Sequence, residues 1–220
     1  MSAFLDQEDY LHFALGNVKE CLTKFAEMFD GSKMRVFLTG DGNFREQVAT
    51  LLPYKGNRDA LHKPKYYQEI KQYMIHNWNA EVIHGQEADD ALSIAQYAAT
   101  DDSTVIISID KDLDQVPGWH YNFVKENLYY VEEEAGDLRL FHQMLVGDRT
   151  DNIPGIKGIG DVKADKLIYG DCNSDIDRVR EEVKKLYQKE YGNAWEGAYF
   201  ECGILLYMRR EEGQEECPLL

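Results

Sequence analysis

Several features are missing from this 220-residue sequence, and each absence excludes a class of protein. No apolar run approaches the roughly 20 residues that a membrane-spanning helix needs. The N-terminus lacks a basic segment followed by an apolar one, so we expect no secretion signal. The four cysteines are scattered without a CxxC pair, which argues against a zinc site and favours reduced thiols in a cytoplasm.

Positive charge is also in short supply. The chain carries 24 Lys and Arg against 40 Asp and Glu, for a net charge of −16. This balance disfavours a passive nucleic-acid binder, whose binding face would be basic. A cluster of carboxylates holding divalent cations would reconcile an acidic chain with a phosphodiester substrate, whereas a solubilising acidic surface explains most of the charge. Residues 54–64 are a local exception, because this stretch is polar, basic and aperiodic.

The hydrophobic pattern that is present predicts an α/β fold with a mostly parallel central sheet flanked by helices. Thr104–Ile109 is a continuous apolar run, typical of a parallel strand buried on both faces. We expect an acidic turn at 132–136 and a frayed, polar tail from Glu211 to Leu220. The predicted strands are 34–39, 80–83, 104–109 and 126–131, and the predicted helices are 5–29, 43–52, 65–78, 87–99, 137–148, 161–168, 176–186 and 195–209.

Acidic residues follow three of the predicted strands. Ligands of such sheets bind outside the carboxyl ends of the strands, so we expect these side chains to converge. All-oxygen clusters suit Mg²⁺ or Mn²⁺, and two such ions about 4 Å apart can promote phosphodiester hydrolysis. A lone Asp is more often a helix cap or a surface acid, and Asp90 fits that first-turn role. The converging acids are Asp41, Glu87, Asp89, Asp110 and Asp112, with Asp148 and Asp151 as a further pair three residues apart.

A glycine-punctuated turn follows that last acidic pair. Pro154–Gly160 leads into a predicted helix, whose N-terminal N–H groups suit a phosphate. Lys157 and Lys163 lie beside the turn and could position a duplex through its phosphates. The alternative is ordinary scaffold packing by apolar residues such as Ile156 and Ile159, and the two roles are compatible.

Three motifs occur in order: Gly85–Asp90, Ile107–Asp112 and Gly147–Gly155. With Phe44–Arg45 and Tyr54–Arg58, they resemble the 5′ nuclease (flap endonuclease) superfamily over roughly residues 34–170. The resemblance is to its bacteriophage 5′-to-3′ exonucleases and to the nuclease domain of bacterial DNA polymerase I.

This resemblance implies a PIN-like nuclease core over residues 1–135, including a helical gateway at 54–80. It implies a helical region at 136–220 that contains a helix–hairpin–helix motif at 146–168. The implied activity is that of a 5′-to-3′ exonuclease or structure-specific 5′ flap endonuclease, which hydrolyses DNA with two Mg²⁺ or Mn²⁺ ions. The implied location is a bacterial or phage-infected cytoplasm, with duplex ends, 5′ flaps or branched DNA as partners and no membrane.

The resemblance also assigns roles residue by residue. Lys55, Arg58 and Asp110 match catalytic positions. The alternative for Lys55 and Arg58 is that both are ordinary solvated cations of a loop. Tyr54 matches an aromatic residue on which a terminal base stacks. Its alternative role is structural, by packing against Leu51 or Leu52. The first-metal ligands are Asp41, Glu87, Asp89 and Asp110, and the second-metal ligands are Asp112, Asp148 and Asp151. The carbonyl groups of Ile156 and Ile159 match positions that hold K⁺. The residues that match DNA contacts are Arg45, Tyr54, Lys55, Arg58, Gly155, Lys157, Gly158, Gly160 and Lys163.

One departure qualifies the resemblance. Members of the superfamily begin with a hydrophobic strand that ends in an aspartate, and here only Met1–Asp6 precedes the first predicted helix. A missing central strand would expose strand edges, which proteins normally cover. We therefore expect a second chain or a dimer partner to cover the gap. Two other functions remain open: a catalytically weak, structure-specific DNA-binding replication accessory protein, and a ribonuclease on a related acidic-cluster fold.

Overall fold

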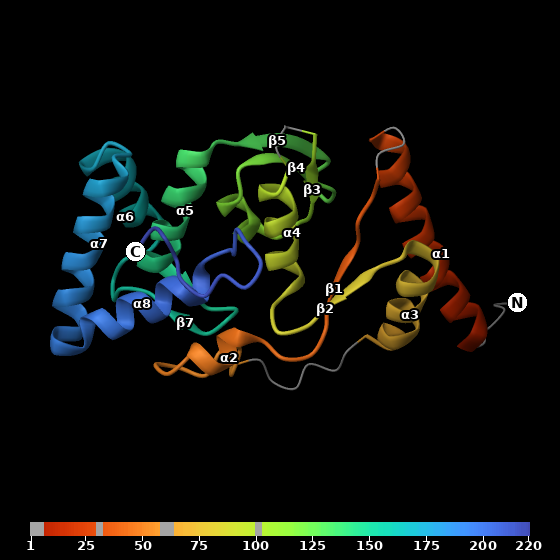
Figure 1. The fold of residues 1–220 in the computed structure, drawn as a ribbon, viewed down its shortest axis with the longest axis horizontal. Coiled ribbons are helices and arrows are strands. Elements are labelled where there is room, and N and C mark those ends of the chain that lie inside the picture. The colour runs from red at the N-terminus through yellow and green to blue at the C-terminus, as the bar shows by residue number, and fades with distance from the viewer. Residues whose placement is uncertain (1–6, 30–32, 58–63, 100–102) are drawn as a thin grey trace, which may run out of the picture.

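Helices and strands alternate along the first two thirds of the chain, and helices alone fill the rest (Figure 1). The computed structural model describes residues 7–29, 33–57, 64–99 and 103–220. The strands are β1 (Phe37–Thr39), β2 (Glu81–Ile83), β3 (Val105–Ile107), β4 (Gly118–Asn122), β5 (Asn127–Val131), β6 (Gly147–Asp148) and β7 (Ile153–Pro154). The α-helices are α1 (Gln7–Met28), α2 (Phe44–Val48), α3 (Tyr67–Trp78), α4 (Ala88–Tyr97), α5 (Glu133–Val146), α6 (Asp161–Asp165), α7 (Ile176–Tyr191) and α8 (Trp195–Leu206).

The mostly parallel central sheet is only partly confirmed. β1 pairs with β2 in parallel and β3 pairs with β4 in parallel, but the two pairs belong to separate sheets. β5 runs antiparallel to β4, because the two strands are joined by the short turn 123–126, which reverses the chain at Glu126 with φ +50°. β4 itself was not predicted, since Pro117 and Gly118 interrupt the apolar pattern at its start.

Most predicted helices are confirmed, with one change at α5. The predicted acidic turn at 132–136 is wrong, because Glu133 and Glu134 form the first turn of α5. Carboxylates at that position are favourable beside the unpaired N–H groups of a helix start. α6 passes directly into a π-helical turn, Lys166–Asp171.

The larger hydrophobic core lies in the helical region. Leu140, Met144, Val179, Val183 and Tyr199 are fully buried where α5, α7 and α8 pack together. A second, smaller cluster of Ile106, Leu113 and Val116 supports the β3–β5 sheet.

The C-terminal tail belongs to the larger core. Cys217 is buried, and Leu220 packs so closely on Gly203 of α8 that a β-carbon there would lie 2.5 Å from the leucine. The predicted frayed tail is therefore wrong.

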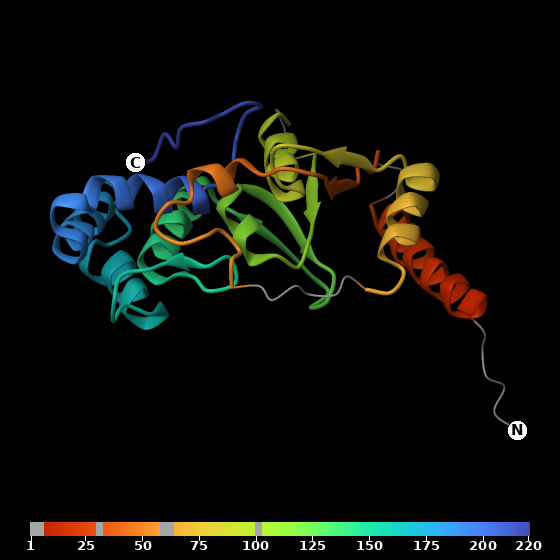
Figure 2. The same cartoon turned by 90° about the horizontal axis from the view of Figure 1, so that it is seen from below.

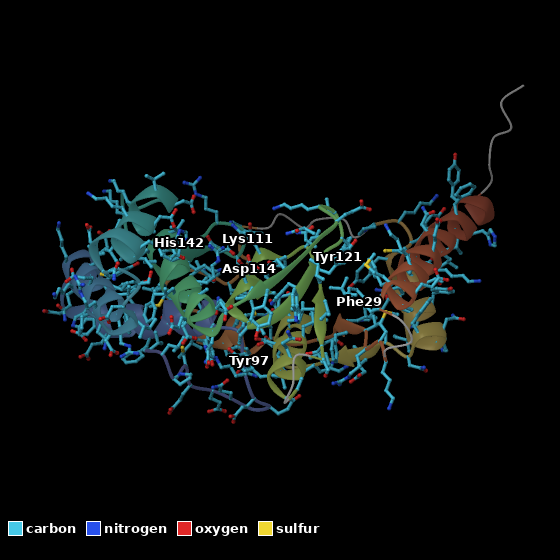
Figure 3. All side chains as sticks on the ribbon, turned by 90° about the horizontal axis from the view of Figure 1, so that it is seen from above. Phe29, Tyr97, Lys111, Asp114, Tyr121 and His142 are labelled. Atoms are coloured by element: carbon cyan, nitrogen blue, oxygen red, sulfur yellow. The ribbon has the colours of Figure 1, made fainter. Side chains whose placement is uncertain are left out.

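The molecule is elongated, with α1 and α3 at one end and α6, α7 and α8 at the other (Figures 1 and 2). The β3–β5 sheet lies between them, and Figure 3 shows Phe29 beside Tyr121 where α1 reaches this sheet, with ring centroids 5.9 Å apart. Residues 1–6, on which the prediction of a missing first strand depends, lie outside the described residues. Over the described part of the chain, every helix is too short or too polar to cross a membrane.

Candidate metal and nucleic-acid site

Carboxylates from three parts of the chain line one cavity of about 160 Å³. The start of α4 contributes two of them, the turn after β3 two more, and β6 with the turn that follows it the last two. They share this cavity with Tyr54, Lys55 and Gln143. The six acidic residues are Glu87, Asp89, Asp110, Asp112, Asp148 and Asp151. The convergence predicted from the strand ends is present for Glu87, Asp89, Asp110 and Asp112, and the further pair Asp148 and Asp151 joins them.

Crowding of like charges shows in the titration of two of these acids. Burial, followed by the nearby carboxylates of Asp110 and Glu87, raises the pKa of Asp89 to about 7. Burial, followed by Asp110 and Asp148, raises the pKa of Asp112 to about 6. Both shifts mean that ionised carboxylates here lack compensating positive charge, which a cation in the cavity would supply.

Lys55 provides the positive charge closest to these acids. Its ammonium group forms a short ion pair with Glu87 and lies 3.6 Å from the Oδ2 atom of Asp151. Tyr54 points the same way, since its hydroxyl donates to Asp151 Oδ2 at 2.7 Å and lies 3.3 Å from Glu87 Oε2. Lys55 Nζ also lies 4.9 Å from the centre of the Tyr54 ring, so it occupies one face of that ring. Both residues therefore belong to the cavity, and base stacking by Tyr54 stays a prediction.

The loop that carries Tyr54 and Lys55 is attached to the turn that carries the last two acids. The backbone N–H of Lys55 donates to the carbonyl of Asp151 at 2.8 Å. Asn152 Nδ2 donates to the carbonyl of Pro53 at 2.9 Å. These bonds fix the loop cation and the Asp151 carboxylate in one unit.

Two buried glutamines, absent from the predicted site, support the Asp112 side of the cavity. Gln143 Nε2 donates to Asp112 Oδ1 at 2.8 Å, and Gln143 Oε1 accepts from Gln115 Nε2 at 2.6 Å. Asp112 is further held by its own N–H, which donates to Asp110 Oδ1 at 2.9 Å. A polar residue on the buried face of a predicted helix is the one sequence signal that could have identified Gln143.

Asp41 is the one predicted metal ligand that does not line the cavity. It follows β1, is exposed, and its N–H lies 3.2 Å from His84 Nδ1. Its carbonyl accepts from the N–H of Gly85 at 3.1 Å, so the residue is adjacent to the loop that leads to Glu87.

The predicted DNA contact of Arg45 is wrong. Arg45 is 2% exposed, and its guanidinium group forms a bidentate ion pair with Asp90, which is completely buried. Its remaining N–H groups donate to the carbonyls of Leu205 and Tyr207 at 2.9 Å. These bonds hold the guanidinium group against protein acceptors, so Arg45 joins α2 and α4 to the end of α8.

Around the predicted hairpin, Lys157, Gly158, Gly160 and Lys163 are exposed. Gly155 serves packing instead, because a β-carbon there would lie 2.2 Å from the carbonyl carbon of Val146. Its own DNA contact has no support in this geometry.

Lys163 Nζ donates to the carbonyl of Gly158 at 2.6 Å, and Ile159 N–H donates to the carbonyl of Ile156 at 3.0 Å. Among the described residues, nothing supports the predicted K⁺ site. The basic hairpin surface stays a prediction for DNA.

The acidic cavity matches a divalent cation in its chemistry. Its side-chain ligands are carboxylate oxygens, which Mg²⁺ and Mn²⁺ prefer. Within the described residues, no three His, Cys, Asp or Glu side chains stand close enough together to hold a metal ion as they are. Arg58, the second predicted loop cation, lies outside the described residues.

Curated relatives of the chain are bacterial and bacteriophage enzymes. The chain is 37% identical over 155 residues to DNA polymerase I of Rhizobium leguminosarum, a match that covers 62% of this chain and 15% of that protein. It is 32% identical over 130 residues to the 5′-3′ exonuclease of Bacillus subtilis, covering 51% of this chain and 42% of that protein. The chain thus spans less than half the length of either relative. No protein-family model matches it.

A solved structure shares the fold. The bacteriophage T5 flap endonuclease, in a pseudo-enzyme–product complex with DNA and metal ions, matches with a TM-score of 0.62 at 19% identity. The match covers 87% of this chain and 80% of that one. Together with the named relatives, it confirms the resemblance to the 5′ nucleases that the three sequence motifs predicted.

Proposed function

We propose that this chain is a divalent-metal-dependent nuclease that hydrolyses DNA from a 5′ end or at a 5′ flap. The observation that carries the proposal is the single cavity lined by six carboxylates from distant parts of the chain. Relatives named 5′-3′ exonuclease and a neighbour solved with DNA and metal ions support the reaction class.

The cations would be held in two groups of ligands. Glu87, Asp89 and Asp110 would hold one, and Asp112, Asp148 and Asp151 the other, once the side chains close around them. When bound, two divalent cations activate a water molecule and stabilise the leaving oxygen of a phosphodiester. The raised pKa values of Asp89 and Asp112, which come first from burial and then from the neighbouring carboxylates, support this role, since a cation would stabilise the ionised forms.

Lys55 lies between two carboxylates of the cavity and can also bind a phosphate. In this structure it neutralises Glu87 and Asp151, and binding of cations there would free its ammonium group. A released Lys55 would then contact the scissile phosphate as the charge on it grows. Lys157 and Lys163 would hold the duplex through its backbone without reading sequence.

The position of Lys55 favours a second function, DNA binding without cleavage. Because Lys55 occupies the position between Glu87 and Asp151, the cavity resembles one that is kept closed to cations. A structure-specific DNA-binding protein without cleavage activity would fit that state. The predicted second chain has no support among the described residues.

A cleavage assay separates the two functions. We expect the protein to cut 5′-flap and blunt duplex DNA with Mg²⁺ or Mn²⁺ and to stop in EDTA. We expect Asp110→Asn to abolish cleavage while the protein still binds the flap DNA. Binding by the unmodified protein without cleavage in either cation would refute the nuclease and favour the accessory protein.

A further inference from the structure

The end of α8 reaches the acidic cavity through a chain of buried amides. Gln115 and Gln143 are 4% and 5% exposed, and each makes hydrogen bonds at both ends of its side-chain amide. Gln115 Nε2 donates to the carbonyl of Leu206 at 2.7 Å, and Gln115 Oε1 accepts from the N–H of Met208 at 3.2 Å. The chain therefore runs from the backbone at 206–208 through Gln115 and Gln143 to Asp112.

The backbone fixes the direction of this chain. A flipped Gln115 amide would set its oxygen against the carbonyl of Leu206 and its NH₂ group against the N–H of Met208, and both contacts would be repulsive. The second hydrogen of Gln115 Nε2 must then meet the oxygen of Gln143, so the NH₂ group of Gln143 faces Asp112. Since both glutamines are buried, their amides have no solvated alternative.

We propose that Gln143, oriented by Gln115 and the 206–208 backbone, is a positioning residue that sets the carboxylate of Asp112 for cation binding. The proposal rests on the proposed function. Gln143 engages the Oδ1 atom of Asp112 and leaves Oδ2 as the oxygen free of this bond. Outer hydrogen bonds of this kind orient metal ligands, and their loss typically costs about 10- to 100-fold in metal affinity.

Calorimetry of Mn²⁺ binding to Gln143→Met tests this positioning role. The substitution keeps the length of the side chain but removes its hydrogen-bond donor. We expect the affinity for Mn²⁺ to fall roughly tenfold or more, as is typical for such outer ligands. Binding of flap DNA in EDTA should be unchanged, because Asp112 contacts DNA only through the cation. Gln115→Met should shift Mn²⁺ affinity in the same direction by a smaller factor, since Gln143 keeps its donor but loses its fixed orientation.

Gln96→Met is the matched control. Gln96 is also a buried glutamine, but its Nε2 donates to the carbonyls of Pro117 and Trp119 and lies outside the cavity. If Gln143 had only a structural role, Gln143→Met would behave like Gln96→Met. Both variants would lose thermal stability and keep the parent affinity for Mn²⁺. We expect Mn²⁺ affinity to fall in Gln143→Met and to stay at the parent value in Gln96→Met.

Two negative results are distinguishable. An unmodified protein that binds Mn²⁺ and a Gln143→Met variant that binds it equally well would overturn the positioning role alone. An unmodified protein that binds no Mn²⁺ and cuts no DNA would overturn the proposed function and the positioning role together. Should Gln143→Met not fold, unchanged Mn²⁺ affinity in Gln115→Met would overturn the positioning role.

Discussion

Single residues in the cavity behave according to their neighbours more than to their type. Asp89 and Asp112 carry raised pKa values, whereas the carboxylate of Asp90, next in sequence to Asp89, forms an ion pair with Arg45. A carboxylate among other carboxylates is ready to take a cation, and a carboxylate paired with a buried guanidinium is not. Asp89 and Asp90 differ because the first lines the cavity, whereas the second faces Arg45 in the protein interior.

The raised pKa of Asp89 gives a pH dependence of stability with a definite sign. The folded-state value of about 7 lies above the usual 3.8, so the folded protein binds this proton more tightly than the unfolded chain does. Ionising Asp89 therefore costs stability, and the free energy of unfolding in EDTA should fall as the pH rises from 4 to 8. At about 1.4 kcal/mol per pKa unit the fall is of the order of a few kcal/mol.

Urea unfolding at pH 5 and pH 8 measures this effect. Asp89→Asn, which cannot ionise, should lose less stability than the unmodified protein between the two values. Equal losses in the two proteins would contradict the shift assigned to Asp89.

The buried pair of Arg45 and Asp90 should matter more for stability than any exposed pair. Asp90→Asn leaves the Arg45 guanidinium group without a counter-charge in the interior, which typically costs about 3–5 kcal/mol. The matched control is Glu81→Gln, which breaks the exposed pair with Arg35 and should cost less than about 1 kcal/mol. Chemical denaturation of both variants tests the expected order, and similar losses in the two would contradict it.

How much of the site the sequence could predict depends on the residue. Glu87, Asp89, Asp110, Asp112, Asp148 and Asp151 were found because strand ends and short motifs determine where they lie. Arg45 was misassigned, because a sequence does not tell whether a basic side chain points outward or toward a buried acid. Gln115 and Gln143 were missed, because a neutral amide carries no charge, and only its place on the buried face of a predicted helix could have identified Gln143.

Among the elements, the loop after α2 depends on the helical region for its place. Glu201 of α8 accepts from the N–H groups of Thr50 and Leu51 at 2.8 and 2.7 Å, and the Thr50 hydroxyl donates a further, short bond to it. Glu201 is 9% exposed. The loop that presents Tyr54 and Lys55 is thus fixed to α8 at one end and to Asp151 and Asn152 at the other.

Replacing this carboxylate should loosen the loop. Glu201→Gln replaces the charged acceptor of the Thr50 and Leu51 N–H groups by a neutral amide oxygen and turns an NH₂ group toward the Thr50 hydroxyl, and weakening such buried, charge-assisted hydrogen bonds costs about 1–3 kcal/mol. We expect faster tryptic cleavage after Lys55 in the native protein, as well as lower stability. Glu196→Gln, on the exposed face of α8, should change neither. Unchanged cleavage after Lys55 in Glu201→Gln would argue against the anchoring role.

Strand pairing was the least predictable level among the elements. The short apolar runs at 34–39, 80–83 and 104–109 were read correctly as strands, since their composition is local. Which strands pair depends on contacts between distant segments, and those have no local signature. The antiparallel β4 and the division into separate sheets are therefore structural findings.

At the scale of the whole molecule, the cavity lies where the α/β part meets the helical part. Figure 1 shows α2, α4 and α8 meeting near the centre of the elongated molecule. The larger hydrophobic core lies on the helical side of this junction, and Arg45 crosses it through its hydrogen bonds to the carbonyls of Leu205 and Tyr207. Asp148 and Asp151 follow directly from α5 of the larger core, so this core supports two of the six acids of the cavity.

Cation-dependent cleavage of a 5′-flap DNA by Asp112→Asn and Asp114→Asn tests the central claim most directly. The two acids are two residues apart, but Asp112 lines the cavity, whereas Asp114 Oδ1 accepts from the hydroxyl of Tyr129 outside it. The acidic cavity as the catalytic cation site predicts that Asp112→Asn loses at least about 100-fold in Mg²⁺-dependent rate, the scale expected of an electrostatic contribution in an active site. Asp114→Asn should cut at nearly the parent rate. Equal rates for the two variants would contradict the assignment of this cavity.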